Sequence, residues 1–321
     1  MGMKTICFLA ALFGLLQLPG RAAPRPVATP PAEVTMNQDA GCGGPLFVTL
    51  RLESGEQLPF MVDTGSPLTL LDKSLEAQLG KRVGTMRVAN VGQPLLEEGL
   101  YAAPKLYLGN VLLVGASTVA TRDIQHTKFK RAKGILGMDY LSHYCIQLDF
   151  ESGKLRFLDR ERLKVSDLGK AFPIILRKVG PQWKFLRPLI DQAPLCGSGT
   201  NVMVDTGCVP DGLMPRSEMP PNGPGVGRTN LAECVWNGQV YTNLTIAATG
   251  QFYSIGLSFL ARHLVTLDFP GRMLYLKAQR VGPLEGPEPP VPNDQGGANG
   301  RQPSTSQTNR TSTAAASHRS P

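Results

Sequence analysis

The chain repeats a short pattern, and this internal repeat restricts its fold more than any other feature of the 321 residues. One apolar run ends in Asp63-Thr64-Gly65, and a second ends in Asp205-Thr206-Gly207. Both runs have the composition of a buried strand. Before the first run, residues 46–52 and 57–62 flank a Glu-Ser-Gly-Glu turn, which predicts a β-hairpin. We therefore expect two similar β-rich units.

A second pair of segments strengthens the repeat. A glycine-centred apolar segment around Gly137 is followed by a strand-like run that reaches Asp149. The same succession occurs around Gly256 and Asp268, 119 positions later in both cases. Each copy then turns and ends on another short apolar run. The turns explain the two aspartates better than catalysis does, because aspartate commonly caps a tight turn.

The first copy contains an insertion. Its Asp-Thr-Gly lies 142 positions before the second one, so it holds 23 more residues (142 − 119) between its two motifs. These residues are expected between Gly80 and Gly109. An insertion in one unit only predicts a hairpin that covers a shared cleft.

Composition agrees with a β-rich fold. The chain has 35 Gly and 27 Pro, and only 18% of its residues are charged, which disfavours long helices. Hydrophobic residues make up 42%, which is enough to form a core. We assign residues 46–168 to an N-terminal lobe and residues 169–280 to a C-terminal lobe.

The two ends of the chain have different compositions. Residues 1–22 start with a basic segment, continue with a short apolar run and end in small residues, as in a secretory signal peptide. Residues 23–45 are rich in Pro and Gly and predict a linker, whereas residues 281–321 are predicted to be a disordered tail. No later stretch is apolar for 18 residues. We expect a secreted or periplasmic protein with no stable membrane insertion after removal of the signal peptide.

The net charge of +8 does not by itself indicate nucleic-acid binding. No finger, basic-zipper or aromatic RNA-binding motif accompanies the basic residues. The densest basic stretch reads as a solvated loop and consists of Arg122, Lys128, Lys130, Arg131 and Lys133. We therefore expect no nucleic-acid partner.

Cysteine and histidine spacing gives no sign of a metal site. Five cysteines follow residue 22, so at most two intrachain disulfides are expected among them. The four histidines fit no zinc-binding spacing. We expect no metal and no cofactor.

The repeated Val-Asp-Thr-Gly and the Ile-Leu-Gly segment resemble those of the pepsin-like and retropepsin-like aspartic proteases, over about residues 46–280. This resemblance implies an all-β, bilobal fold with two pseudo-symmetric, β-barrel-like lobes and an active-site cleft between them. It also implies that Asp63 and Asp205 are the catalytic pair. Retropepsins dimerise to assemble such a pair, whereas this chain carries both halves, so a monomer is expected.

The chemistry of the family explains the two aspartates. Two carboxylates about 3 Å apart repel by about 5 kcal/mol at an effective dielectric constant of about 20, so they share one proton. The ionised partner activates a water, and the protonated partner polarises and protonates the scissile carbonyl. The sequence does not assign the proton to Asp63 or to Asp205.

The remaining loop residues are expected to support the pair. Gly65 and Gly207 allow close approach of the backbone. The resemblance implies that Thr64 and Thr206 brace the two loops and that Ser66 donates to Asp63. Cys208 stands where the family more often has Thr or Ser, and a thiol is a weak donor, so Asp205 is expected to be held less firmly.

Several assignments remain open. Tyr101 is a candidate flap residue that contacts the substrate, although residues 88–94 fit the flap tip equally well. Cys208 as a nucleophile would need a histidine base, which the sequence does not place nearby. The sequence favours an exported aspartic endopeptidase acting on peptides or proteins. The alternative is a catalytically inactive, peptide-binding homologue.

Overall fold

A computed structural model of the chain describes residues 32–88, 96–127, 129–179, 185–190, 201–219, 227–249, 252–280 and 282. The predicted signal peptide and, apart from Gly282, the predicted tail lie outside these residues. Within the described part of the chain, no helix is long and apolar enough to cross a membrane.

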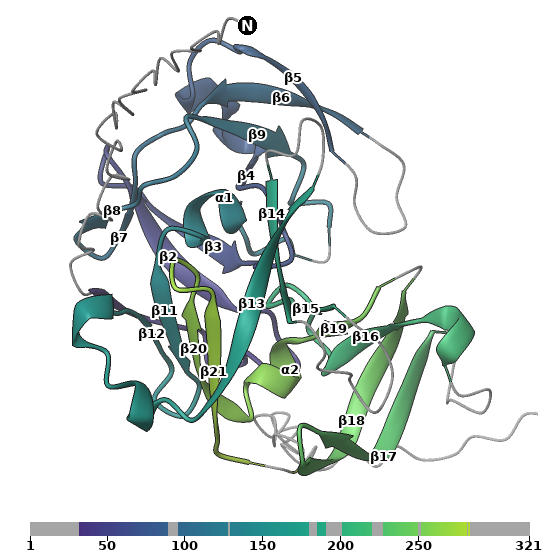
Figure 1. Ribbon diagram of the computed structural model, residues 1–321. Helices are drawn as coiled ribbons and strands as arrows, with labels where there is room; N and C mark the ends of the chain where they lie inside the picture. Colours follow the sequence, from purple (N-terminus) through teal and green to yellow (C-terminus); the bar gives the residue numbers. More distant parts are fainter. Residues whose placement is uncertain are drawn as a thin grey trace, which may run out of the picture. The chain divides into compact units, whose positions relative to one another are not determined.

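The first half of the chain builds a nine-stranded sheet (Figure 1). The predicted hairpin is present as β2 and β3, which pair in antiparallel fashion. The insertion contributes a second hairpin, β5 and β6, whose connection lies outside the described residues. In spatial order the strands are β5 (Gly84–Val88), β6 (Leu96–Ala102), β9 (Thr118–Arg122), β4 (Leu70–Asp72), β10 (Gly134–Leu136), β3 (Gln57–Val62), β2 (Phe47–Leu52), β7 (Leu106–Leu108) and β8 (Val111–Leu112).

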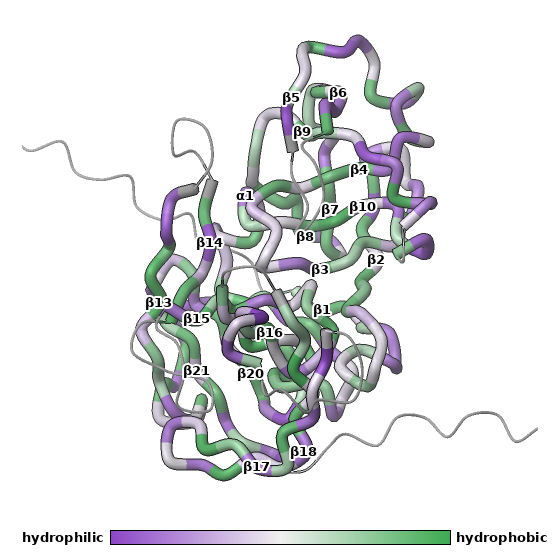
Figure 2. The backbone as a smooth tube through the Cα atoms, turned by 90° about the vertical axis from the view of Figure 1, so that its right-hand side faces the viewer, coloured by the Kyte–Doolittle hydropathy of each residue, from purple (hydrophilic) through white to green (hydrophobic). Residues whose placement is uncertain are grey.

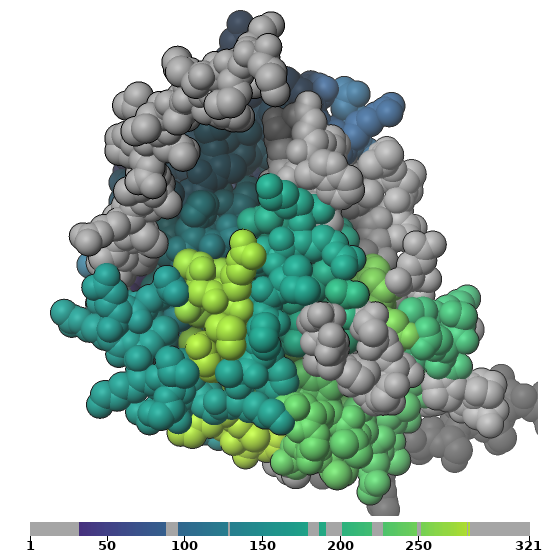
Figure 3. Space-filling model, in the orientation of Figure 1, coloured from purple at the N-terminus to yellow at the C-terminus, as the bar shows by residue number. Residues whose placement is uncertain are grey.

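The second sheet has twelve strands and contains elements from both halves of the chain. Strands of the two halves are neighbours at its centre, where β11 lies next to β20 and β21 next to β13, and yellow-green atoms of the late segments lie between teal atoms on the face seen in Figure 3. In spatial order the strands are β1 (Ala32–Thr35), β12 (Lys154–Phe157), β11 (Cys145–Asp149), β20 (His263–Asp268), β21 (Met273–Ala278), β13 (Lys170–Val179), β14 (Phe185–Ile190), β15 (Val202–Val204), β19 (Ser254–Ile255), β16 (Gly212–Pro215), β18 (Gln239–Thr249) and β17 (Arg228–Trp236).

The helices are short and their positions follow the repeat. The two α-helices are α1 (Met138–Leu141) and α2 (Leu257–Leu260), which start 119 positions apart. Buried side chains from both sheets and both α-helices form one large hydrophobic cluster, and green, hydrophobic segments run through the strands in Figure 2. The 3₁₀ helices are η1 (Lys73–Gln78), η2 (Arg160–Arg162), η3 (Val165–Asp167) and η5 (Arg216–Glu218).

The register of the second sheet locates the pseudo-two-fold axis that relates the two copies of the repeat. Strands β11 and β20, which are equivalent in the repeat, pair directly with each other. Gln147 lies opposite Thr266, 119 positions later, and its Nε2 donates to the Thr266 Oγ1 at 3.2 Å. Since these two residues are equivalent positions, the axis that relates the copies passes between them. The sequence repeat is therefore a structural repeat.

The predicted linker over residues 23–45 is wrong in its second part. Ala32–Thr35 forms β1, which pairs with β12, and Met36 and Ala40 are buried. A four-residue strand with only half-buried inward positions gives a weak local signal, and its partner lies about 120 positions away in the sequence. Long-range pairing of this kind is not visible in local composition.

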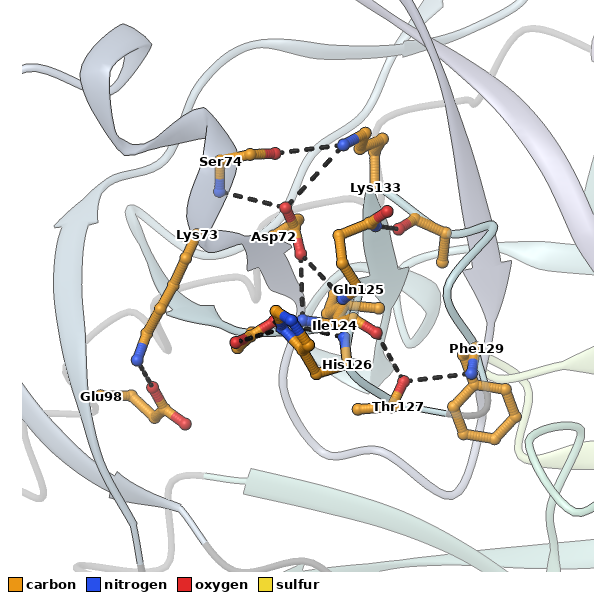
Figure 4. A network of polar contacts seen from close by, with 12 residues as sticks. Asp72, Lys73, Ser74, Glu98, Ile124, Gln125, His126, Thr127, Phe129 and Lys133 are labelled. Carbon is orange, nitrogen blue, oxygen red and sulfur yellow. Dashed lines mark hydrogen bonds and ion pairs between the residues drawn. The ribbon is translucent and has the colours of Figure 1, made fainter.

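The basic stretch is in part the solvated loop that its composition suggested, since Lys130 and Arg131 are exposed, but Arg122 is not part of that loop. Arg122 is only 5% exposed, and its Nε donates to the Glu98 Oε1 at 3.1 Å. Lys133 Nζ lies 3.9 Å from the Asp72 Oδ1, within a network that also holds Ser74 and backbone N–H groups of residues 124 and 125 (Figure 4). The counter-charges come from segments far away in the sequence. Lys128 lies outside the described residues.

Candidate functional site

Both Asp-Thr-Gly loops begin where a central strand of each unit ends. Asp63 follows β3, which runs parallel to β10, and Asp205 follows β15, which runs parallel to β19. The Asp63 N–H donates to the Leu136 carbonyl at 3.0 Å, and the Asp205 N–H donates to the Ile255 carbonyl at 3.0 Å. In each copy of the repeat, the backbone of the glycine-centred segment therefore accepts a hydrogen bond from the N–H of the Asp-Thr-Gly aspartate.

Two threonine hydroxyls join the loops. The Thr64 hydroxyl donates to the Val204 carbonyl at 2.7 Å and accepts from the Thr206 N–H at 3.0 Å. The Thr206 hydroxyl donates to the Val62 carbonyl at 2.8 Å and accepts from the Thr64 N–H at 3.0 Å. Both threonines are buried. The four reciprocal hydrogen bonds bring loops that are 142 positions apart into direct contact.

The glycines of the loops leave room for the opposite carboxylates. A Cβ on Gly65 would lie 2.4 Å from the Asp205 Oδ1, and a Cβ on Gly207 would lie 2.4 Å from the Asp63 Cγ. Side-chain carbons do not approach other heavy atoms this closely. Each glycine therefore packs directly against the aspartate of the other loop, and an alanine at either position would displace it.

The two carboxylates interact with each other and with backbone donors. A side-chain hydrogen bond joins Asp63 and Asp205. The Ser66 N–H donates to the Asp63 Oδ1 at 2.9 Å, and the N–H groups of Gly207 and Cys208 donate to the Asp205 Oδ1 at 3.0 and 3.1 Å. This arrangement can hold one proton and one negative charge.

Burial and the repulsion between the two carboxylates disfavour the state in which Asp63 and Asp205 are both ionised. Burial raises the pKa of Asp63, while backbone N–H donors and the charge of Arg187 act in the opposite direction. Burial also raises the pKa of Asp205, and the charge of Asp63 raises it further. The pKa of both carboxyls therefore lies above the usual range of an aspartate, which favours retention of a proton by the pair.

The Ser66 hydroxyl does not donate to Asp63 as expected. It donates to the Leu68 carbonyl at 2.7 Å, and the backbone N–H of Ser66 contacts the carboxylate instead. The Cys208 thiol likewise lies 4.0 Å from the Pro210 carbonyl, two residues further along its loop. The two side chains occupy equivalent positions. The weaker hold on Asp205 that the thiol was expected to cause stays a prediction.

The other candidates from the sequence lie away from the pair. Tyr101 is buried in β6, where it pairs with Val119 of β9, so its predicted contact with substrate remains a prediction. Asp149 and Asp268 cap turns, accepting from the N–H groups three residues later at 3.1 and 2.9 Å. Their role is structural, as the sequence indicated.

Cysteine and histidine side chains provide no alternative centre in the described part of the chain, where no group of three or more metal-binding side chains occurs. Cys42 and Cys145 are thiols, so the five cysteines after residue 22 can form at most one intrachain disulfide. His263 is buried, with Nδ1 3.0 Å from the Phe259 carbonyl and Nε2 2.7 Å from the Tyr241 hydroxyl. A carbonyl only accepts, so Nδ1 donates and a neutral ring satisfies both contacts.

Arg187 also acts on the pair, although its position in the sequence did not single it out. It lies in β14, and its charge acts on Asp63. The signal in the sequence is a single charged residue within the otherwise apolar strand Phe185–Ile190. Such a residue on a core strand calls for an explanation in terms of partners.

Comparisons with known proteins identify the fold. No family model matches the chain, and no curated protein matches its sequence. The crystal structure of edgp matches 78% of this chain and 95% of its own, with a TM-score of 0.51 and 10% sequence identity. The crystal structure of basic 7S globulin from soybean matches 78% of this chain and 96% of its own, with a TM-score of 0.48 and 11% identity. The first match, the two lobes and the paired loops show an all-β, bilobal pepsin-like fold.

Proposed function

We propose that the protein is an aspartic endopeptidase whose Asp63 and Asp205 hydrolyse peptide bonds with an activated water. The observation that supports this function best is the assembly of two Asp-Thr-Gly loops by reciprocal threonine hydrogen bonds. This assembly leaves two interacting carboxylates with a shared proton between the lobes. A purely structural loop would not require a half-buried and a buried acidic group in contact.

The roles of the two aspartates follow from their surroundings. Asp63 is the ionised partner and removes a proton from the attacking water, because Arg187 and the backbone donors favour its negative charge. Asp205 carries the shared proton and donates it toward the carbonyl oxygen of the scissile bond, because burial and the charge of Asp63 favour its neutral form. Thr64, Thr206, Gly65 and Gly207 act as positioning residues.

Hydrolysis of a library of fluorescence-quenched peptides tests this proposal, between about pH 3 and pH 7, where carboxylate pairs titrate. We expect cleavage by the wild type and none by Asp63→Asn or Asp205→Asn. Asp149→Asn is the matched control, since it removes a carboxylate that caps a turn. Cleavage that persists in both dyad variants would show that another group carries out the reaction.

Peptide binding without hydrolysis is the second candidate. In its favour, the Ser66 hydroxyl donates to the Leu68 carbonyl of its own loop instead of to the Asp63 carboxylate. The fold match brings no activity with it. Specific peptide binding by the wild type, with no cleavage at any pH tested, would favour this candidate.

Export and the monomeric state remain part of the proposal. The signal-like composition of residues 1–22 supports export. Expression of the full chain in a secreting host, followed by mass determination of the exported protein, tests it. A mature N-terminus after Ala22 is expected, and retention of the uncleaved chain in the cell would contradict it.

A further inference from the structure

The strand β14 contacts one element next to each catalytic loop, which makes its side chains candidates for substrate contact. It pairs with β15, which leads directly into Asp205. It also contacts α1, whose first residue, Met138, donates its N–H to the Ser66 carbonyl at 2.9 Å (Figure 1). A side chain on β14 can therefore reach the region between the two loops.

Arg187 lies on this strand, and one nitrogen of its guanidinium lacks a hydrogen-bond partner among the described residues. Its Nε is buried and has no hydrogen-bond partner there. No carboxylate of the described residues forms an ion pair with it, and Asp63, whose pKa it lowers, is within its electrostatic reach. A buried guanidinium N–H without an acceptor is unfavourable by an amount comparable to a lost charged hydrogen bond.

The neighbouring strand increases the positive charge at this position. Arg177 of β13 lies directly opposite Arg187 in the antiparallel pair, so both side chains leave the same face of the sheet. Arg177 is exposed and donates to the Asn201 Oδ1 at 3.2 Å. Like charges at opposite positions destabilise a sheet, and an anion bound between or beside them removes the repulsion.

We propose that Arg187 binds a carboxylate side chain of the peptide substrate next to the scissile bond, so that the site prefers substrates with Glu or Asp at a flanking position. This inference rests on the proposed function, because it assigns the substrate class of the same site. The planar guanidinium suits a carboxylate, to which it can donate two parallel hydrogen bonds. Asp63 is not that acceptor, since it already accepts from backbone donors and shares the dyad proton.

Matched peptide pairs that differ only by Glu or Gln at each position flanking the cleaved bond test the proposal. At about pH 6, where a glutamate side chain is ionised, we expect wild-type kcat/KM to be about tenfold or more higher for the Glu peptide at one position. The preference should shrink at about pH 3.5, where the glutamate is largely protonated. Arg187→Met should abolish it, Arg187→Lys should retain part of it, and Arg228→Gln, which changes an exposed arginine of β17, should leave it unchanged.

Binding of the same peptides to Asp205→Asn, followed by fluorescence anisotropy, separates this proposal from the proposed function. Absence of cleavage by the wild type refutes the endopeptidase, whereas tighter binding of Glu peptides that disappears in Asp205→Asn/Arg187→Met still supports the role of Arg187. Equal values for Glu and Gln peptides at every flanking position overturn the proposal. This comparison uses no Arg187 variant, so it stands even if Arg187→Met fails to fold.

Discussion

Replacing Thr206 by Val tests whether the two lobes are held together by the reciprocal hydroxyl contacts. The substitution removes one donated and one accepted hydrogen bond, leaving the Val62 carbonyl and the Thr64 N–H without these partners in a buried position. An unsatisfied buried group destabilises a protein by about 1–3 kcal/mol, so we expect a loss of about 2–6 kcal/mol in the free energy of unfolding. By the repeat, Thr64→Val should cause a similar loss.

Urea denaturation followed by fluorescence measures this loss as a lower midpoint at an unchanged slope. Thr206→Ser is the matched control, because it keeps the hydroxyl and removes a single methyl group, which should destabilise by about 1 kcal/mol. A loss below about 1 kcal/mol for Thr206→Val would refute the reasoning, because the sum of two buried contacts cannot be that small. An equal loss for Ser and Val would refute it as well, since packing rather than hydrogen bonding would then explain the effect.

The other predictions concern the dyad and one buried histidine. Gly207→Ala should abolish hydrolysis, because its Cβ would lie 2.4 Å from the Asp63 Cγ. The control Gly84→Ala, whose Cβ would lie 3.8 Å from its nearest neighbour, should leave Tm unchanged. An active Gly207→Ala would contradict the close approach of this glycine to Asp63. Burial lowers the pKa of His263 to about 4. The neutral ring therefore contributes fully to stability above about pH 6.5, and this contribution is lost as the pH falls toward 4. The complete loss corresponds to about 3 kcal/mol in the free energy of unfolding. In His263→Gln, the difference between urea midpoints at about pH 7 and pH 4 should therefore be smaller than in the wild type, and an equal difference would exclude His263 as its source. Arg187→Met should raise the pKa of Asp63 and move the acid limb of the kcat/KM profile to higher pH, whereas an unmoved limb would show that this charge does not reach the dyad.

The repeat made much of the fold predictable. Equal spacing of the apolar segments identified equivalent strands, such as β11 and β20, and the unequal spacing of the two Asp-Thr-Gly motifs located the extra hairpin of β5 and β6. These features depend on local composition and on counting. They need no knowledge of which strands meet in space.

The features that were missed depend on contacts between distant segments. β1 becomes a strand because β12 offers a free edge, and Arg122 is buried because Glu98 of another strand neutralises it. Neither partner is visible from the residue's own neighbours. The direction of the Ser66 hydroxyl was also missed, because the choice between a carboxylate and the carbonyl of Leu68 depends on the shape of the loop.

The two Asp-Thr-Gly loops are nearly symmetric, but the charges that surround the two aspartates are not. Equivalent glycines, threonines and backbone donors place the two aspartates in matching positions, and symmetry alone would leave the shared proton equally on both. The charge of Arg187 in β14 acts to lower the pKa of Asp63, whereas the charge of Asp63 raises the pKa of Asp205. A charged residue in an apolar strand can therefore add to the difference between the two aspartates without altering the loops that bring them together.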